Sequence, residues 1–268
     1  MPIRSYIATS IARRLIARMQ ATHLQQRISV FAGPPGIGKT TAIDVFARRV
    51  SGNVAVVKMA RQSAREVLAL QHLLDSVRRL SGAVSTEFPV SAWQLRNAVY
   101  CALCQWAEAD PAKARRGEYL KGDFPQLTVV FDEAQNLSRN AIEALRYWND
   151  PDRCYAPFPL GLVFVGNSEF SLQTDVDGQS TISAAVADRA LYVQTFDYDD
   201  VTDDDLRLFI EHRGVIDSGA VTALLRYFRT SRAARSLRQV GNLLDEIVAV
   251  AKRREVTSDI VREVLGLA

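Results

Sequence analysis

Apolar residues near the start of the chain recur at the spacing of one helix face. Ile7, Ile11, Leu15, Ile16 and Met19 follow the steps of three and four residues that place side chains on one side of an α-helix. The arginines between them fall on the other side. We therefore expect a basic amphipathic helix within residues 1–26 that packs on the domain following it.

Short apolar runs further along the chain predict buried strands. They lie at residues 28–31 (ISVF), 128–131 (TVVF), 160–165 (LGLVFV) and 191–196 (LYVQTF). Segments with helical periodicity occur between them, at residues 40–50 and 91–109. This order of strands and helices predicts an α/β domain.

The last third of the chain is predicted to be entirely helical. Helical patterns cover residues 203–214, 218–229, 231–254 and 257–268, and Gly214, Thr230-Ser231 and Thr257-Ser258 supply the breaks and caps between them. The segment before them, residues 197–205 (DYDDVTDDD), holds six aspartates but does not fit the EF-hand calcium loop, since Thr202 replaces its glycine and Leu208 its final glutamate. We expect Thr202 to cap a helix whose first turn contains the later aspartates.

The overall composition does not alter the predicted fold, but the distribution of charge along the chain is informative. The chain of 268 residues is 48% hydrophobic and 24% charged, as is usual for globular proteins, and no apolar run approaches the ~18 residues of a membrane span. Its formal net charge is +3, yet the first 43 residues contain six Lys or Arg and no Asp or Glu, which leaves −3 for the remainder. A transit peptide is one explanation for a basic start. Because a phosphate-binding motif begins at Gly33, we instead expect a folded segment whose arginines face solvent or contact nucleic acid or an acidic partner.

The three cysteines do not form a recognisable metal site. Cys101 and Cys104 form a CxxC inside a helical pattern, with no second pair, and Cys154 stands apart. Buried thiols in a reducing cytoplasm are the expectation.

A glycine-rich motif follows the first predicted strand. Gly33, Pro34, Pro35, Gly36, Ile37, Gly38, Lys39 and Thr40 match the phosphate-binding P-loop, and Thr41 continues into the predicted helix. The glycines let backbone N–H groups surround phosphates, and the helix N-terminus adds its positive end. Lys39 is expected to reach the β- and γ-phosphates, and the Thr40 hydroxyl to ligate Mg²⁺.

Two adjacent carboxylates end the strand predicted at residues 128–131. Because buried charge needs a partner, Asp132 and Glu133 are expected at a strand tip facing a cation. In a P-loop fold Asp132 holds Mg²⁺, directly or through water, and Glu133 polarises the water that attacks the γ-phosphate. A second acid here favours hydrolysis over nucleotide binding alone.

Further polar residues are candidates for contacting phosphate. Asn167 ends the next strand and either senses the γ-phosphate or caps a turn. Arg189 either reaches across a subunit boundary or forms a surface ion pair. Arg235, with Arg238 in reserve, is the candidate from the helical segment.

The order of these motifs resembles that of AAA+ ATPases along nearly the whole chain. The resemblance implies an α/β P-loop NTPase domain at residues 27–196, with a parallel central sheet flanked by helices, and a small all-helical C-terminal lid at residues 197–268. It makes Lys39, Thr40, Asp132 and Glu133 the Walker residues, with ATP and Mg²⁺ as ligands. In the same way Asn167 becomes sensor 1, Arg189 the arginine finger and Arg235 sensor 2. The family also implies assembly into rings or helical filaments with ATP between subunits.

The stretch FDEAQNLSRNAIEALRYWND, residues 131–150, resembles a narrower group, the DNA transposition regulators of the phage Mu B type and their transposon relatives. The resemblance implies nonspecific binding to double-stranded DNA, self-assembly on it, recruitment of a transposase and release upon ATP hydrolysis, in a bacterial or phage-encoded cytoplasmic protein without membrane contact. Only 32 residues precede Gly33, whereas the Mu B type has a DNA-binding helical domain there, so DNA binding is expected to fall to the ATPase domain itself.

Two basic stretches could bind DNA phosphates. Their candidate residues are Lys58, Arg61 and Arg65 in the first stretch and Lys113, Arg115, Arg116 and Lys121 in the second. Scattered solvated side chains are the alternative.

Other functions remain open beside transposition. Bacterial secretion ATPases share the DEAQNL sequence motif, and AAA+ protein remodellers share the overall domain organisation. Remodellers commonly carry an aromatic–apolar–glycine loop after the second strand, which residues 58–90 lack. A nucleotide-gated scaffold without turnover is a third possibility, against which Glu133 argues.

Overall fold

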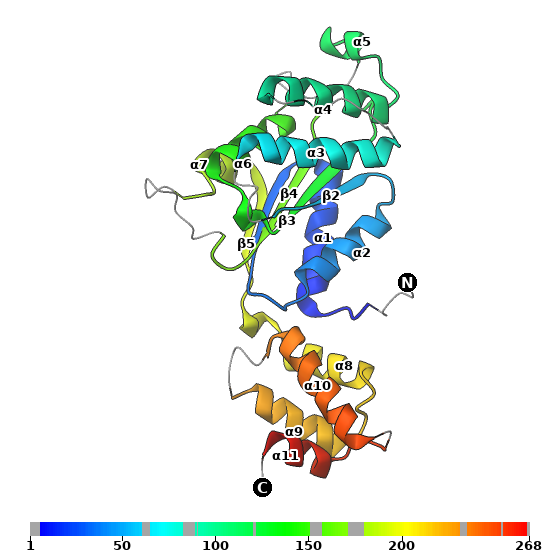
Figure 1. Ribbon diagram of the computed structural model, residues 1–268, viewed down its shortest axis with the longest axis vertical. Helices are drawn as coiled ribbons and strands as arrows, with labels where there is room; N and C mark the ends of the chain where they lie inside the picture. The colour runs from blue at the N-terminus through cyan, green and yellow to red at the C-terminus, as the bar shows by residue number, and fades with distance from the viewer. Residues whose placement is uncertain are drawn as a thin grey trace. The chain divides into compact units, whose positions relative to one another are not determined.

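A computed structural model describes residues 6–60, 65–82, 89, 91–119, 122–150, 157–170, 180–230, 235–252 and 254–266. Contacts between backbone positions divide the chain into two compact units (Figure 1). The first unit contains residues 1–15, 34–42 and 196–268, and the second contains residues 16–33 and 43–195. The division falls inside the helices α1 (Ser10–Gln25) and α2 (Lys39–Arg49).

A five-stranded parallel sheet forms the centre of the second unit. Its strands lie in the order β2 (Val54–Lys58), β3 (Thr128–Asp132), β4 (Gly161–Gly166), β1 (Ile28–Ala32) and β5 (Ala190–Thr195). All four neighbouring pairs run parallel. Every residue of the three central strands is buried, which explains why they read as continuous apolar runs, while the edge strand β5 is largely half-buried or exposed. The predicted parallel α/β fold is confirmed.

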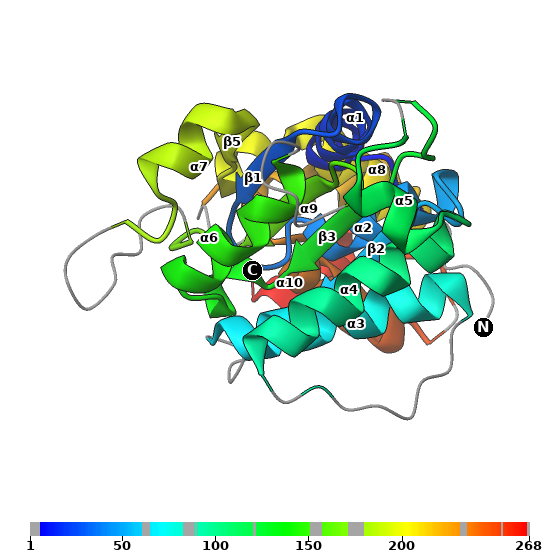
Figure 2. The same ribbon diagram turned by 90° about the horizontal axis from the view of Figure 1, so that it is seen from above.

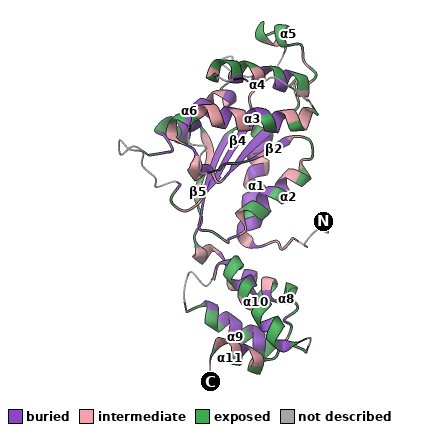
Figure 3. Cartoon of the chain, viewed as in Figure 1, coloured by how far each residue is buried: buried purple, intermediate pink, exposed green. Residues whose placement is uncertain are grey.

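Helices cover both faces of this sheet. The helices of the second unit, besides most of α1 and most of α2, are α3 (Glu66–Ser81), α4 (Ala92–Trp106), α5 (Pro111–Arg115), α6 (Arg139–Arg146) and α7 (Ala184–Arg189), with short 3₁₀ turns η1 (Ala134–Asn136) and η2 (Tyr147–Asn149). Alternate strand residues such as Val30, Phe131 and Phe164 join side chains of α3, α4 and α6 in one buried core. Figure 3 shows the strands of the sheet coloured largely as buried. Figure 2 places α1 on the other side of the sheet from α3 and α4.

Polar contacts attach the second half of α1 to that other face. The hydroxyls of Thr22 and of Ser29 in β1 are 2.6 Å apart, and His23 Nδ1 is 3.0 Å from the Thr128 hydroxyl of β3. Ser29 and Thr128 alternate with the core residues of their strands, so they point away from α3 and α4. Burial lowers the pKa of His23 from its ordinary value of 6.5, which favours the neutral ring.

The first unit is helical, as the sequence predicts for its C-terminal part. Its helices are α8 (Asp203–His212), α9 (Ser218–Phe228), α10 (Leu237–Ala251) and α11 (Ser258–Leu265), preceded by the 3₁₀ turn η4 (Tyr198–Asp200). The Thr202 hydroxyl accepts from Asp205 N at 3.1 Å while the Asp205 carboxylate accepts from Thr202 N at 3.1 Å. This capping box confirms the predicted start of α8.

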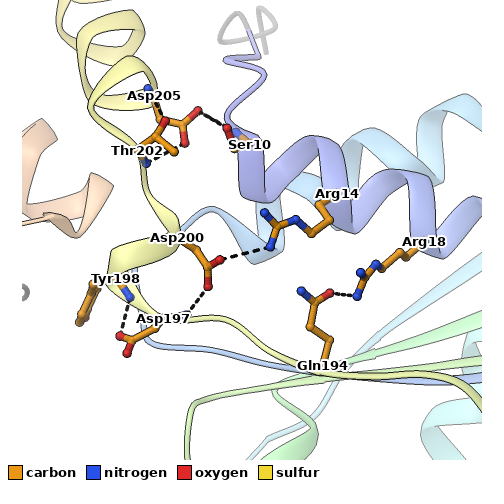
Figure 4. A network of polar contacts seen from close by, with 9 residues as sticks. All are labelled: Ser10, Arg14, Arg18, Gln194, Asp197, Tyr198, Asp200, Thr202 and Asp205. Carbon is orange, nitrogen blue, oxygen red and sulfur yellow. Dashed lines mark hydrogen bonds and ion pairs between the residues drawn. The ribbon is translucent and has the colours of Figure 1, made fainter.

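Two of the α1 arginines are paired within the protein (Figure 4). In the first unit, Arg14 lies 3.2 Å from Asp200, and the backbone N of Ser10 donates to Asp205 at 2.7 Å. In the second unit, Arg18 donates to Gln194 of β5 and stacks 4.9 Å from the Tyr192 ring. These two arginines therefore hold α1 in place, which neither the solvated nor the nucleic-acid interpretation of this helix anticipates.

The CxxC cysteines lie on α4, with Cys101 exposed and Cys104 buried, while Cys154 lies outside the described residues. Burial raises the pKa of the Cys104 thiol to about 11, so this thiol is protonated at neutral pH. Within the described parts of the chain, no helix combines the length and the apolar character needed to cross a membrane.

Candidate nucleotide site

The phosphate-binding loop occupies residues 33–38, between β1 and α2. Gly36 and Gly38 have φ values of +81° and +94°, in the left-handed region that glycine adopts without steric cost. The Lys39 Nζ donates to the Pro34 carbonyl at 2.8 Å, so the ammonium folds back over the loop. The first turn of α2 contains no acidic residue, which suits an anion at this helix N-terminus.

The acidic pair lies at the end of β3. Asp132 is the last residue of the strand and is buried, with 4% of its surface exposed. Its carboxylate accepts from the backbone N of Glu133 at 3.0 Å. Glu133 has φ +59° and ψ +39°, a left-handed conformation unusual for a residue with a side chain. Such strain is concentrated at functional sites.

The turn after Glu133 is fixed by hydrogen bonds on both sides. Asn136 N donates to the Glu133 carbonyl at 3.0 Å, and its side-chain amide donates to the Met59 carbonyl at 2.9 Å. Met59 N in turn donates to the Asp132 carbonyl at 2.9 Å. The backbone that presents Glu133 is therefore tied to the segment after β2.

Gln135 joins the acidic pair to the tip of β4, a role that the sequence analysis missed. Its Nε2 donates to the Glu133 carboxylate, and its Oε1 accepts from the backbone N of Asn167 at 3.1 Å. The Asn167 Oδ1 is buried and has no hydrogen-bond partner among the described residues. A buried amide oxygen without a partner is unfavourable by about 1–3 kcal/mol, so this atom is a candidate for contact with a ligand.

The sheet register brings these residues to one edge. Asp132 aligns with Val165 of β4, and Gly166 aligns with Ala32 of β1. Because the strands are parallel, the chain leaves β1 toward Gly33, β3 toward Glu133 and β4 toward Asn167 at the same edge. Ligands of open α/β sheets bind at this carboxyl edge.

Arg189 ends α7 and forms an ion pair. Its Nη1 lies 2.7 Å from Asp150, and its carbonyl accepts from the Arg27 guanidinium at 3.0 Å. The hydrogen bond to Asp150 raises the pKa of Arg189. The arginine side chain is 44% exposed, whereas that of Asp150 is 8% exposed. The surface ion pair expected as one alternative is present, and the arginine-finger role stays a prediction.

The start of α10 lies against the phosphate loop within the first unit. The Ser236 hydroxyl donates to the Pro35 carbonyl at 3.4 Å, and the Tyr198 hydroxyl donates to the same oxygen at 3.2 Å. A Cβ placed on Gly36 would lie 3.2 Å from the Cβ of Arg238. Tyr198 gave no signal in the sequence, because its contact joins segments 163 residues apart.

The preferred lid arginine is held by an aspartate. Arg235 donates to Asp203, which also accepts from Arg229 Nε at 2.9 Å. The Arg235 Nε is buried and has no hydrogen-bond partner among the described residues. Arg235 directly precedes Ser236 and Arg238 lies two residues after it, so the choice between them as the phosphate-contacting residue remains a prediction.

The candidate DNA-binding residues that the structure describes divide into two groups. Lys58, at the end of β2, and Arg65, before α3, are exposed, as is Lys113 on α5. Arg115 and Arg116 are exposed as well, but Arg115 donates to Asn97 and lies 5.0 Å from the Tyr100 ring, and Arg116 pairs with Glu118. Arg61 and Lys121 lie outside the described residues.

Comparison with solved structures finds similar folds. RuvB from Thermotoga maritima, a Holliday junction branch migration motor, matches with a TM-score of 0.55 and 14% identity over 97% of this chain and 70% of its own. Cdc6p from Pyrobaculum aerophilum matches with a TM-score of 0.58 and 14% identity over 97% of this chain and 68% of its own. At such low identity the likeness concerns the fold alone, and no curated protein matches the sequence.

The family described as "AAA domain" matches residues 22–173, more than half of the 268 residues. That range contains the phosphate loop, the acidic pair and Asn167. This chain therefore belongs to the AAA domain family, whose members are P-loop nucleoside triphosphatases.

Proposed function

We propose that this chain binds ATP with Mg²⁺ and hydrolyses it. Lys39 and the backbone N–H groups of Gly33 and residues 36–40 bind the β- and γ-phosphates, and Thr40 and Asp132 hold the cation. Bound Mg²⁺ supplies charge neutralisation to the phosphate oxygens. The left-handed glycines of the loop and the acid-free first turn of α2 support this assignment.

The observation that carries the proposal of hydrolysis is the cluster of Glu133, Gln135 and Asn167. A nucleotide-binding scaffold needs no second acid, yet Glu133 is kept in a strained backbone conformation and its carboxylate is hydrogen-bonded. We assign it as the base that orients and deprotonates the attacking water. The buried Asn167 Oδ1 fits contact with that water.

Arg189 and Arg235 complete the proposed site in an assembled state. Arg189 is exposed enough to reach a neighbouring protomer once it leaves Asp150, where it stabilises charge on the transferred phosphoryl group. Arg235, or Arg238 in its place, binds phosphate from the lid of its own protomer.

For the biological role, we propose that the ATP-bound chain assembles on duplex DNA of arbitrary sequence, recruits or regulates a transposase, and leaves the DNA upon hydrolysis. The support is the likeness of residues 131–150 to the Mu B type of regulator and the exposure of Lys58, Arg65 and Lys113. The fold likeness to a Holliday junction branch migration motor is consistent with action on DNA.

Steady-state ATP hydrolysis, measured with and without duplex DNA, tests the enzymatic part. We expect Glu133→Gln to lower kcat by about 10²–10⁴-fold while ATP still binds, because only the base is lost. Lys39→Ala should instead weaken ATP binding by about 10- to 100-fold, since it removes charge-assisted hydrogen bonds to phosphate. Unchanged kcat in Glu133→Gln would remove the base from the proposal.

Electron microscopy with duplex DNA and a nonhydrolysable ATP analogue separates the candidate roles. Filaments on DNA support the transposition role, whereas closed rings that form without DNA favour a protein-remodelling or secretion-type ATPase. Lys58→Ala should reduce the slope of log binding constant against log salt by about 0.9 if this side chain neutralises one phosphate. An unchanged slope would exclude Lys58 from the DNA surface.

A further inference from the structure

Gln135 is held by two hydrogen bonds that lead to different parts of the site. One arm reaches the Glu133 carboxylate, and the other reaches the backbone N of Asn167, which lies 32 residues away at the tip of β4. Gln135 itself lies in η1, whose backbone is fixed by the bonds of Asn136 to Glu133 and Met59. Its side chain therefore projects from a fixed base.

The orientation of the Gln135 amide follows from its partners. A backbone N–H can only donate, so the group facing Asn167 N must be the carbonyl oxygen of the carboxamide. The NH₂ group then faces Glu133, whose carboxylate oxygen accepts its hydrogen bond. Both arms are satisfied in this one orientation, and neither would be if the amide were flipped.

We propose that Gln135 is a positioning residue for ATP hydrolysis that couples the Glu133 carboxylate to the tip of β4, an inference that rests on the hydrolysis assigned to this site. A glutamate side chain has three rotatable bonds, and the charge-assisted hydrogen bond from Gln135 removes much of this freedom. The other arm fixes the backbone of Asn167, whose Oδ1 is buried and unpartnered. Base and phosphate sensor are thereby held at a fixed spacing, and a shift of one moves the other.

Gln135→Ala tests this coupling, because the substitution should change kcat but not KM. We expect kcat to fall about 10- to 100-fold, as for a small misplacement of a catalytic group, with KM for ATP within about twofold of wild type. Gln126→Ala is the matched control, because Gln126 also donates one hydrogen bond, to the Leu24 carbonyl at 2.8 Å, outside the nucleotide site. Equal kcat values for the two variants would overturn the proposal.

Gln135→Glu separates the two arms. It retains an acceptor for Asn167 N but places a second carboxylate beside Glu133, so kcat should fall at least as far as in Gln135→Ala. Wild-type kcat in this variant would refute the Glu133 arm. If Gln135→Ala proves unstable in thermal unfolding, Gln135→Met keeps the side-chain volume without either hydrogen bond and is expected to show the same kcat loss.

A double-mutant cycle shows whether Gln135 acts through Glu133. In single-turnover hydrolysis, Gln135→Ala added to Glu133→Gln should lower the rate by less than threefold, because the base has already been removed. A full multiplication of the two effects would contradict coupling. If wild type and Glu133→Gln hydrolyse ATP equally poorly, the proposed hydrolysis fails; if they differ as expected but Gln135→Ala matches the Gln126 control, only this inference fails.

Discussion

Gly36→Ala tests the packing of the α10 start on the phosphate loop. The backbone of Gly36 has φ +81°, which a residue with a Cβ adopts at a cost of about 1–2 kcal/mol. The added Cβ would also lie 2.1 Å from the Ser236 hydroxyl and 3.2 Å from the Arg238 Cβ. The substitution therefore combines backbone strain with crowding.

The two contributions can be estimated separately. The Ser236 hydroxyl can rotate away and give up its 3.4 Å hydrogen bond to Pro35, but the Arg238 Cβ is carried by the helix backbone and moves only with α10. Crowding of this kind costs about 1–3 kcal/mol. The free energy of unfolding should thus fall by about 2–5 kcal/mol in Gly36→Ala.

Urea denaturation without nucleotide, followed by circular dichroism at a helical wavelength, measures this loss. Gly52→Ala is the matched control, because Gly52 has φ +84° and a Cβ there would meet nothing within 4 Å. Gly52→Ala should lower the free energy of unfolding only by the cost of the backbone conformation, about 1–2 kcal/mol. If Gly36→Ala is no more destabilising than Gly52→Ala, the start of α10 does not crowd Gly36.

Two further predictions concern charge. Asp203→Ala should lower the free energy of unfolding by about 1–3 kcal/mol in urea denaturation, because two arginines lose their common acceptor. Asp204 is the exposed neighbour, and Asp204→Ala should lower the free energy of unfolding by less than about 1 kcal/mol. Equal losses in the two variants would contradict the role of Asp203 as the common acceptor. Burial alone would raise the pKa of Glu143, but hydrogen bonds from Ser183 and Arg146 outweigh it and hold the pKa below the ordinary 4.5. A depressed carboxyl pKa adds stability above the unfolded pKa that is lost as pH falls through the folded value, so the stability gap between wild type and Glu143→Gln should be full at pH 7 and close in acid; a gap independent of pH would contradict this.

Local patterns in the sequence were sufficient to predict four of the five strands, β1, β3, β4 and β5. The central strands are buried on both faces, so each appears in the sequence as an apolar run. Such a run can be recognised without information about the neighbouring strands. The short helix α5 was not predicted, because none of its five residues is buried and its formation depends on the Asp110 cap and on Pro111. The grouping of residues 34–42 with the C-terminal helices depends on contacts such as that of Pro35 with Ser236, which no local pattern encodes.

In the candidate site, too, local motifs were predictable from the sequence and tertiary contacts were not. The phosphate loop and the acidic pair are contiguous motifs, because their chemistry requires fixed spacing along the chain. The hydrogen bond of Gln135 to Asn167 and the ion pairs of Arg189 and Arg235 join residues more than 30 positions apart, so they follow from tertiary packing alone. The sequence analysis identified Asn167, Arg189 and Arg235 as candidates and missed Gln135, but it could not predict which residues these side chains contact.

The proposed function makes the affinity of this chain for DNA depend on bound ATP. The most direct measurement is the fluorescence anisotropy of a labelled duplex of arbitrary sequence, titrated with Glu133→Gln protein at low salt, with and without ATP and Mg²⁺. We expect binding at least tenfold tighter with ATP, and loss of this gain in the Glu133→Gln, Lys39→Ala double variant. Equal affinity with and without nucleotide, or no binding in either condition, would contradict the proposed function.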